Sequence, residues 1–362
     1  MPSSTAHPVR IWFNRPFATS YWLFHMLRDN PDGYPVKIYA TQTDPTSPVF
    51  QGADYGELEP DLQGNAYVDW ALDFCERHGI ELFFPRKWIE LIVEAEDRFA
   101  ALGVKLIASS PKAIRLFEDK NLTYRAALEA GVAVPPWRVA SDAESFEREL
   151  HSLQAELESS DRIVVKPTVG VGAQGFRILD EKPRTINRIL EGGLRVSSGE
   201  LIEGYERAEA AGETLPELML LPYLEEPELS VDCLNSPEGE LLKTIPRAKL
   251  SGRQRLFTDE YPEAVELVER LYAGRDLRYI TNTQLRWWRG QLVLLETNTR
   301  PAGGLYATSL TGVNLIWDAV ALALRGEATP KKPRLVDSYV ALESFTELKV
   351  SPHPSQNPGD NR

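Results

Sequence analysis

The first 110 residues of the chain alternate short β-rich runs with segments of helix length. Four runs have strand character and end at turn residues, at positions 9–13, 36–40, 80–84 and 104–108. Between them lie segments of helical character, at 19–28, 67–77 and 88–101. Gly79 and Gly103 stand where two of these helices are expected to end. Strands separated by such helices favour a parallel, doubly wound sheet, and this pattern constrains the fold more than any other feature.

The turn after the first of these strands, residues 14–18, contains no glycine. A dinucleotide-binding sheet needs glycine there, because the backbone must approach the phosphates closely. We therefore expect an α/β fold whose N-terminal domain is Rossmann-like but lacks the phosphate-binding turn.

The rest of the chain divides into three further segments. Residues 111–189 contain two expected helices and two strands that flank a glycine-rich turn. Residues 190–330 contain several strands, with a hairpin expected at Arg289-Gly290, and end in an apolar helix, which gives this part α+β character. Residues 331–362 hold one strand-like run and a tail rich in proline, asparagine and serine, which predicts disorder. The predicted segments are thus 1–110, 111–189, 190–330 and 331–362.

Charge bears on the class of partner. The formal net charge is −13, and a protein that binds nucleic acid usually has a basic face, so we expect no nucleic-acid partner. The acidic excess is concentrated: residues 200–240 hold twelve acids and one basic residue, whereas residues 241–257 hold five basic residues and no acid. A charge run is usually a solvated face, and that reading stays open for both segments.

Several other features bear on metal binding and on the cellular compartment of the protein. Cys75 and Cys233 are too few for a disulfide framework and match no zinc spacing, and the five histidines form no close pair. The N-terminus has no apolar signal core, and no stretch approaches the ~18 apolar residues of a membrane span. We therefore expect a cytoplasmic protein with no membrane partner.

A glycine-rich turn at Gly170, Gly172 and Gly175 matches the spacing G-x-G-x-x-G. In a dinucleotide-binding site this loop opens a helix, but residues 176–180 alternate like a strand, which disfavours that interpretation. A protein kinase has the same spacing, yet the other kinase motifs are absent. The turn then either closes an ordinary hairpin, with glycines supplying positive φ, or covers phosphate groups.

A second candidate site begins at the end of the predicted strand 292–295. Glu296 and Asn298 follow this strand, and residues two apart on a strand point to the same face. A carboxylate and an amide oxygen on a rigid strand are hard ligands of the kind that Mg²⁺ prefers. An acid at a strand end before a Pro-Gly turn is also common without a metal, so this feature alone leaves both interpretations open.

Taken together and in this order, the glycine loop and the Glu296 site resemble the ATP-grasp superfamily, specifically its carboxylate–amine ligase branch. The resemblance covers roughly residues 110–325 and follows the motif order of biotin carboxylase and carbamoyl-phosphate synthase. It implies a two-lobed ATP-grasp module behind the Rossmann-like domain. It also implies ATP and two Mg²⁺ ions as cofactors, with Mn²⁺ as a substitute.

The resemblance implies a nucleotide site as well. Two lysines would bind the ATP phosphates, and the glycine loop would close over them. The run 218–224 would be the hinge whose backbone reads adenine, and an acid after it would accept the ribose hydroxyls. The residues that the resemblance assigns to ATP are Lys120, Lys166, Thr168, Gly170, Gly172, Gly175, Met219, Tyr223, Leu224 and Glu228.

Metal and catalytic groups are implied in the same way. The two metal ions would be held by three oxygen donors, and Glu296 would bridge both ions. The assigned metal ligands are Gln284, Glu296 and Asn298, and the assigned catalytic cations are Arg247, Lys249 and Arg300. Arg300 would steady the transferring phosphoryl group, and the other two would lie over it.

Two positions depart from the pattern of the family. Leu221-Pro222 replaces the commoner Glu-Lys or Gln-Lys of the hinge, which puts the nucleotide preference in doubt. Gln284 replaces the commoner acid, as in carbamoyl-phosphate synthase, and a neutral ligand is tolerable where phosphates complete the metal shell.

This residue set predicts a ligase that activates a small-molecule carboxylate as an acyl phosphate. An amine or similar nucleophile would then attack, with release of ADP and phosphate. Two alternatives stay open: an ATP-grasp-type kinase of small molecules and a non-catalytic module that senses nucleotide. Arg253 and Arg255 fit a substrate carboxylate as well as a solvated loop. Asn14 and Arg15 fit substrate contact as well as a plain turn, and a homo-oligomer is compatible with the chain.

Overall fold

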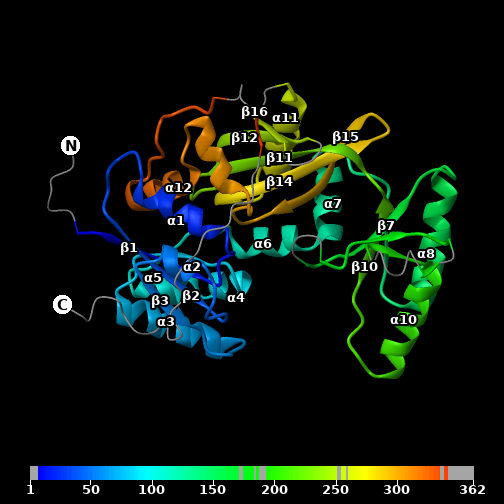
Figure 1. Cartoon of the computed structure of the whole chain (residues 1–362), viewed down its shortest axis with the longest axis horizontal. Coiled ribbons are helices and arrows are strands. Elements are labelled where there is room, and N and C mark those ends of the chain that lie inside the picture. The colour runs from blue at the N-terminus through cyan, green and yellow to red at the C-terminus, as the bar shows by residue number, and fades with distance from the viewer. Residues whose placement is uncertain are drawn as a thin grey trace. The chain divides into compact units, whose positions relative to one another are not determined.

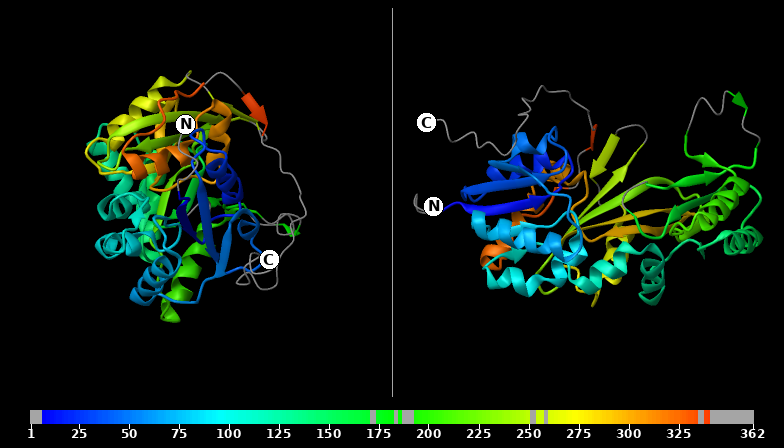
Figure 2. Two further views of the ribbon diagram at one scale, coloured as in Figure 1. Left: turned by 90° about the vertical axis from the view of Figure 1, so that its left-hand side faces the viewer. Right: turned by 90° about the horizontal axis from the view of Figure 1, so that it is seen from below.

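The computed structural model describes residues 7–170, 174–182, 185–186, 193–250, 254–257, 260–334 and 338–340. These residues form three β-sheets and the helices that pack on them (Figures 1 and 2). They fall into two compact units. Unit 1 comprises Met1–Arg115, Leu229–Thr283 and Thr297–Arg362, and unit 2 comprises Leu116–Glu228 and Gln284–Glu296. Gly172, Arg253, the side chain of Arg255 and the predicted tail beyond position 340 lie outside what is described.

Unit 1 contains the expected parallel sheet. Its strands lie in the order β3-β2-β1-β4-β5 and all pair in parallel, which confirms the Rossmann-like α/β character. The strands are β1 Val9–Asn14, β2 Val36–Gln42, β3 Tyr55–Leu58, β4 Leu82–Phe84 and β5 Lys105–Leu106. The helices between them are α1 Ser20–Arg28, α2 Val49–Gly52, α3 Asn65–His78, α4 Ile89–Glu94 and α5 Glu96–Ala101.

Side chains of β1 alternate between two hydrophobic cores. Ile11 and Phe13 belong to a cluster that includes side chains of α1 and of α12 (Leu315–Arg325), whereas Trp12 belongs to a second cluster with side chains of α3 and α5. Trp12 stacks on Phe83 with 3.9 Å between ring centroids. A strand that is apolar at successive positions must be covered on both faces, and the helices provide this cover.

The single helix predicted at 88–101 is in fact two helices. α4 ends at Glu94 and α5 begins at Glu96, because Ala95 has φ −97° and ψ 16°, outside the helical region. The amide of Ala95 donates to the carbonyl of Ile92 at 3.1 Å, which closes a tighter last turn. Apolar periodicity continues across the break, so the sequence did not reveal it.

Unit 2 is built on a second five-stranded sheet, in the order β6-β10-β7-β8-β9. Its strands are β6 Arg138–Ala140, β7 Ile163–Pro167, β8 Arg177–Leu179, β9 Arg195–Val196 and β10 Leu218–Pro222. Its helices are α7 Lys120–Glu129, α8 Ala143–Glu156 and α10 Ser198–Ala210. Phe146 of α8, Tyr205 of α10 and Leu220 of β10 form the centre of its core.

The glycine-rich turn joins two antiparallel strands, as the sequence predicted. β7 and β8 pair antiparallel with Val164 opposite Ile178, and a strand, not a helix, follows Phe176. Gly175 has φ +73°, and a Cβ atom at this position would lie 2.6 Å from the ring of Pro167. Both the backbone angle and the close approach therefore require glycine here.

The third sheet has the order β15-β14-β11-β12-β13-β16. Its strands are β11 Glu225–Asn235, β12 Leu241–Lys249, β13 Gln254–Phe257, β14 Tyr279–Trp288, β15 Gln291–Asn298 and β16 Ser338–Val340. The remaining helices are α6 Pro111–Glu118, α11 Pro262–Tyr272, η1 Leu305–Thr311 and α12 Leu315–Arg325. Arg289 at φ +48° and Gly290 at φ +76° connect β14 to β15, the two-residue hairpin turn that was expected there.

The acid-rich stretch contains a helix that the sequence did not predict. Ser197 and Glu200 form a capping box at the start of α10, and Tyr205 is the buried residue of this helix. Its glutamates are exposed, so the interpretation as a solvated face is right for α10. Among the described helices none is by itself long and apolar enough to cross a membrane, although the bent pair of η1 and α12 meets that criterion by length and composition.

Candidate functional site

Unit 2 places the two predicted phosphate lysines on different elements. Lys120 is the first residue of α7, and Asp119 caps this helix because its carboxylate accepts two backbone N–H groups of the first turn. Lys166 lies within β7, where its backbone stands opposite Met219 of β10. Both lysines are buried, with 6% of Lys120 and 7% of Lys166 exposed.

The ammonium groups of these lysines reach carbonyl oxygens. Lys120 Nζ donates to the carbonyl oxygens of Gly170 at 3.0 Å and of Thr168 at 3.4 Å. Lys166 Nζ donates to the carbonyl oxygen of Leu295 at 3.3 Å. Within the described residues, no carboxylate forms an ion pair with either lysine. The hydrogen bonds therefore hold both groups in place without neutralising their charge.

The electrostatic environment of the lysines is unusual. Burial lowers the pKa of Lys166 to about 8; nearby Glu296 opposes this shift, while Lys120 and Arg286 add to it. Burial also lowers the pKa of Lys120, against the raising effects of Glu296 and then Asp119. Two buried ammonium groups near the Glu296 carboxylate make this part of unit 2 suited to a polyphosphate.

The predicted metal ligands lie on the neighbouring strands β14 and β15. Gln284 of β14 and Glu296 of β15, both in unit 2, are partly exposed, whereas Leu285 and Thr297 beside them are buried. Asn298, in unit 1, follows two residues later on β15 and is also partly exposed. This alternation gives each strand an accessible face with oxygen donors. No group of three or more His, Cys, Asp or Glu residues in the described part of the chain is arranged to hold a metal.

The predicted adenine hinge begins as a central strand. β10 pairs with β6 through residues 218–220 and with β7 through residues 218–222, so the backbone of Met219 is paired on both sides. Past this region, the amide of Tyr223 donates to the carbonyl of Arg162 at 2.7 Å, and the Arg162 guanidinium lies 4.0 Å from the Tyr223 ring centroid. Leu224 is buried. Adenine recognition by this run stays a prediction.

The predicted ribose acid has a partner that sequence reasoning missed. Glu228 Oε2 accepts hydrogen bonds from Nη2 of Arg286 at 3.2 Å and from Nε at 3.3 Å. Nη1 of the same arginine donates to the carbonyl of Leu224 at 3.3 Å, which links the acid to the hinge. Arg286 stands two residues after Gln284 on β14, so the period of two along that strand was the available signal.

Unit 1 holds the predicted catalytic Arg247 in a buried ion pair. Its Nη2 lies 3.1 Å from Oδ2 of Asp232, and the two side chains are 5% and 0% exposed. Asn282 donates to the other carboxylate oxygen of Asp232 at 2.8 Å and to Ser230 Oγ at 3.0 Å. A Cβ atom on Gly304 would lie 2.9 Å from Arg247 Nη1. The guanidinium is therefore fixed by its surroundings, and Asp232 is a second residue that sequence reasoning missed.

The other two predicted catalytic cations also lie in unit 1. Lys249 is the last residue of β12 and is partly exposed. Arg300 follows β15; its Nη1 donates to the carbonyl of Pro301 at 3.4 Å, and its guanidinium lies 5.3 Å from the ring centroid of Phe17. Their catalytic roles stay predictions.

The two candidate substrate residues after β1 have structural partners. The fully buried Asn14 donates to Tyr67 Oη at 2.8 Å and to the carbonyl of Lys87 at 2.9 Å, and it accepts from the amide of Arg86 at 2.6 Å. Arg15 forms an ion pair with Glu59. Of the two interpretations, these contacts favour the turn.

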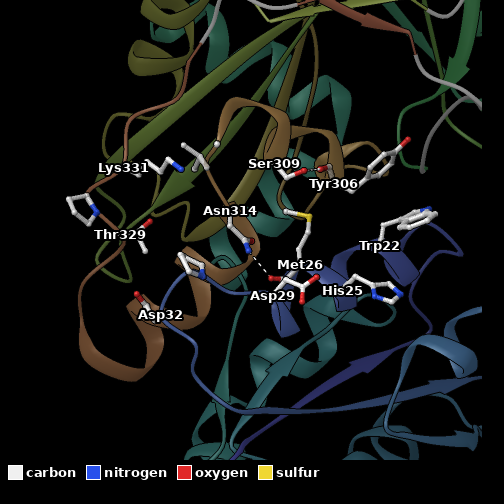
Figure 3. Close-up of a pocket in the computed structure, with 14 residues that line it drawn as sticks. Trp22, His25, Met26, Asp29, Asp32, Tyr306, Ser309, Asn314, Thr329 and Lys331 are labelled. Atoms are coloured by element: carbon white, nitrogen blue, oxygen red, sulfur yellow. Dashed lines mark hydrogen bonds between the residues drawn. The ribbon is translucent and has the colours of Figure 1, made fainter. Parts of the chain in front are cut away.

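A cavity of about 610 Å³ in unit 1 contains none of the predicted site residues (Figure 3). Two polar side chains on its wall have partners. Asn314 donates to the carbonyl of Met26 at 2.7 Å, and Asp32 accepts from Trp317 Nε1 at 2.7 Å and from Arg325 at 2.6 Å. These bonds secure α12, and we assign no ligand to the cavity.

Comparison with known proteins places this geometry in context. The sequence model of a family described as ATP-grasp in the biosynthetic pathway with Ter operon matches residues 214–345. No protein with a curated description matches the sequence.

Three solved structures share the fold over most of their length. N5-carboxyaminoimidazole synthetase from Staphylococcus aureus, in complex with ADP, has a TM-score of 0.65 and 14% identity, covering 91% of this chain and 80% of its own. The biotin carboxylase domain of 2-oxoglutarate carboxylase from Hydrogenobacter thermophilus was solved as a dimer with MgADP, ADP and bicarbonate. It has a TM-score of 0.64 and 18% identity, and the match covers 91% of this chain and 73% of that domain. Biotin carboxylase from Campylobacter jejuni has a TM-score of 0.63 and 15% identity, and the match covers 92% of this chain and 74% of that enzyme.

Proposed function

We propose that this chain, which has the ATP-grasp fold, is an ATP- and Mg²⁺-dependent ligase that joins a small-molecule carboxylate to an amine or similar nucleophile. The observation that carries the proposal is the pair of buried lysines near Glu296 in unit 2. The solved relatives support it, since the Staphylococcus aureus enzyme was solved with ADP and the Hydrogenobacter thermophilus domain with MgADP and bicarbonate.

Lys120 and Lys166 would bind phosphate oxygens of ATP. Lys166 stands on a paired strand and Lys120 at a capped helix start, so both ammonium groups are held in position before the nucleotide arrives. Phosphoryl transfer needs mainly positioning and charge neutralisation, and these residues supply both. Glu228, oriented by Arg286, would accept the ribose hydroxyls.

Gln284, Glu296 and Asn298 fit Mg²⁺, because their donors are oxygens on two neighbouring strands. When bound, the ion neutralises phosphate charge and orients the transferred group. The single carboxylate among these three donors cannot balance the charge of the two predicted Mg²⁺ ions, so the phosphates would balance most of it. We therefore expect these residues to bind metal together with the nucleotide.

The reaction would proceed in two displacements. An oxygen of the substrate carboxylate attacks the γ-phosphorus, the bond to the β–γ bridging oxygen breaks, and ADP leaves. The amine then attacks the carbonyl carbon of the acyl phosphate, loses a proton, and expels phosphate. Arg300 would stabilise the oxyanion of the second step, and Arg247 and Lys249 would stabilise the phosphoryl group in the first.

The proposal is tested by measuring ADP and phosphate release with pooled carboxylates and amines, together with mass spectrometry of the adducts. We expect release that needs both a carboxylate and an amine. Glu296→Gln should abolish Mg²⁺-dependent release, whereas Glu209→Gln, an exposed change on α10, should not.

Other outcomes would favour the alternatives. ADP formation with a phosphorylated product from one substrate alone would identify a kinase. Nucleotide binding without turnover in every pool would identify a sensor. A homo-oligomer, which the dimeric Hydrogenobacter thermophilus domain suggests, is checked by size-exclusion chromatography with light scattering.

A further inference from the structure

The parallel sheet of unit 1 reverses its strand order between β1 and β4. The chain passes from β1 outward to β2 and β3, and then returns to place β4 and β5 on the other side of β1. At such a reversal the connections after the two adjacent strands diverge, and α/β sheets bind ligands outside these carboxyl ends. The two connections here begin after Asn14 and after Phe84.

Each of these two connections carries a residue in a strained conformation. Arg15 has φ +41° and Trp88 has φ +56°, in a region that bulky side chains rarely adopt. Asn14 joins the connections, because its amide group bonds to the backbone at both Arg86 and Lys87. Strain of this kind persists only where the surroundings enforce it, and it collects at functional sites.

Arg86 is the charged side chain that this construction holds in place. Its Nη1 donates to the carbonyl of Pro301 at 3.0 Å, and its guanidinium lies 5.1 Å from the ring centroid of Phe17. Arg300 lies 5.3 Å from the same ring centroid. Among the described residues, no carboxylate pairs with Arg86.

The electrostatics of Arg86 favour an anion. Burial lowers the pKa of Arg86 to about 9, and the like charge of Arg300 adds to the effect. A partly exposed guanidinium that packs against protein atoms near a second cation is disfavoured in its charged form, and a negatively charged ligand beside it would relieve the cost. Phe17 is 46% exposed, so a ligand can reach its ring from solvent.

We propose that Arg86, together with Arg300 and the ring of Phe17, forms a subsite that binds a carboxylate group of the substrate. A guanidinium fork matches the two oxygens of a carboxylate, and the aromatic ring offers an apolar neighbour for the adjoining carbon. The identity of this ligand as substrate rests on the proposed ligase function, whereas the anion site itself does not.

The first test measures thermal unfolding of the full chain in sodium malonate, sodium bicarbonate or sodium phosphate against sodium chloride of equal ionic strength. Malonate should raise the Tm of the native protein, and Arg86→Gln should abolish this rise. Arg98→Gln, which alters an exposed pair with Asp69, should keep it. In chloride alone, Arg86→Gln should melt no lower than the native protein, because it removes a partly desolvated charge near the like charge of Arg300.

These outcomes separate a binding site from a structural arginine. A lower Tm of Arg86→Gln in chloride with the malonate response intact would show that Arg86 only braces Pro301, and would overturn the proposal. A response to phosphate that exceeds those to both carboxylates would also overturn it, because the site would then select phosphate.

The second test is kinetic and keeps this inference distinct from the proposed function. Arg86→Lys retains the charge without the fork, so the KM for the carboxylate should rise about tenfold with kcat nearly unchanged, as expected for a loss of about 1.4 kcal/mol. If turnover occurs and Arg86→Gln leaves this KM unchanged, the subsite is wrong and the ligase stands. If no turnover occurs but malonate stabilises through Arg86, the anion site stands and the ligase is wrong.

Discussion

Lys120 Nζ donates a hydrogen bond to the carbonyl oxygen of Gly170 at 3.0 Å, so the first residue of α7 is tied to the start of the glycine loop. Lys166 makes its hydrogen bond elsewhere, to the carbonyl of Leu295 on β15. The two predicted phosphate lysines therefore have different structural supports, and this difference can be measured.

Removing either lysine should weaken nucleotide binding. Lys120→Met and Lys166→Met each delete one charge expected to contact phosphate, and a charge-assisted hydrogen bond contributes about 1.5–3 kcal/mol, so the Kd for ADP should rise about ten- to a hundredfold. Isothermal titration calorimetry measures this change. Lys112→Met, an exposed position on α6, is the matched control and should bind like the native protein. Native-like binding by both lysine variants would show that the nucleotide binds elsewhere.

Stability should depend on pH through Lys166. Its pKa is about 8 in the folded protein against an ordinary 10.5, so between these values the unfolded chain holds more protons than the folded one. The contribution of Lys166 to the free energy of unfolding should therefore increase as pH rises from about 8 to 10.5, because the buried group no longer has to carry charge. Urea denaturation at several pH values measures this dependence. The free energy of unfolding should increase less steeply with pH in Lys166→Met than in the native protein.

Nucleotide affinity should show the opposite trend. Above pH 8 Lys166 loses its proton, and with it the attraction to phosphate, so ADP should bind more weakly as pH rises. Lys166→Arg keeps its charge over this range and should flatten the dependence. If the affinity for ADP had the same pH profile in both proteins, Lys166 would not be part of the nucleotide site.

Gly175→Ala should impair the loop without unfolding unit 2. The new methyl group would lie 2.6 Å from Pro167 in a backbone conformation with φ +73°, so β7, the loop or both must shift. We expect weaker ADP binding and a lower Tm. Gly204→Ala is the control, because it lies within α10 with open space around it, and alanine there should stabilise the helix by about 1 kcal/mol.

Breaking the Asp232–Arg247 pair should be costly. Asp232→Asn leaves the buried Arg247 without its counter-charge, and removing one partner of a buried ion pair costs about 3–5 kcal/mol. Chemical denaturation measures this loss. A second pair, the partly exposed Lys243 with the buried Asp318 on α12, offers a comparison through Lys243→Met, which should destabilise the protein because Asp318 loses this counter-charge. An Asp232→Asn loss below about 1 kcal/mol would mean that other groups balance Arg247.

The fold was predictable where side-chain period and turn chemistry act locally. The parallel sheet of unit 1 follows from apolar strands spaced by helices, and the hairpin at Arg289 and Gly290 follows from a turn between two apolar runs. The break at Ala95 was not predictable, because the apolar period continues across it while the backbone alone changes.

The residues of the candidate site also differ in how far they could be predicted from the sequence. Lys120, Lys166 and Glu296 could be predicted because each stands in a motif of adjacent residues, and their roles stay predictions. Arg286 and Asp232 were missed because their roles come from side-chain pairs across strands, with partners 58 and 15 positions away. The role proposed for Arg86 follows from its contacts with the ring of Phe17 and with the carbonyl of Pro301, which lies 215 positions away in the sequence.

The unequal attachment of the two lysines has a kinetic consequence. Lys166 lies on β7, and β10 pairs with this strand on the side opposite β8. The sheet therefore holds Lys166 in the position proposed for nucleotide binding. Lys120 shares a hydrogen bond with the loop backbone, so any movement of Gly170 is communicated to it directly. If both lysines bind phosphate as proposed, we expect Lys166 to act mainly in the capture of the nucleotide and Lys120 mainly in its retention, so that association and dissociation rates could be altered separately.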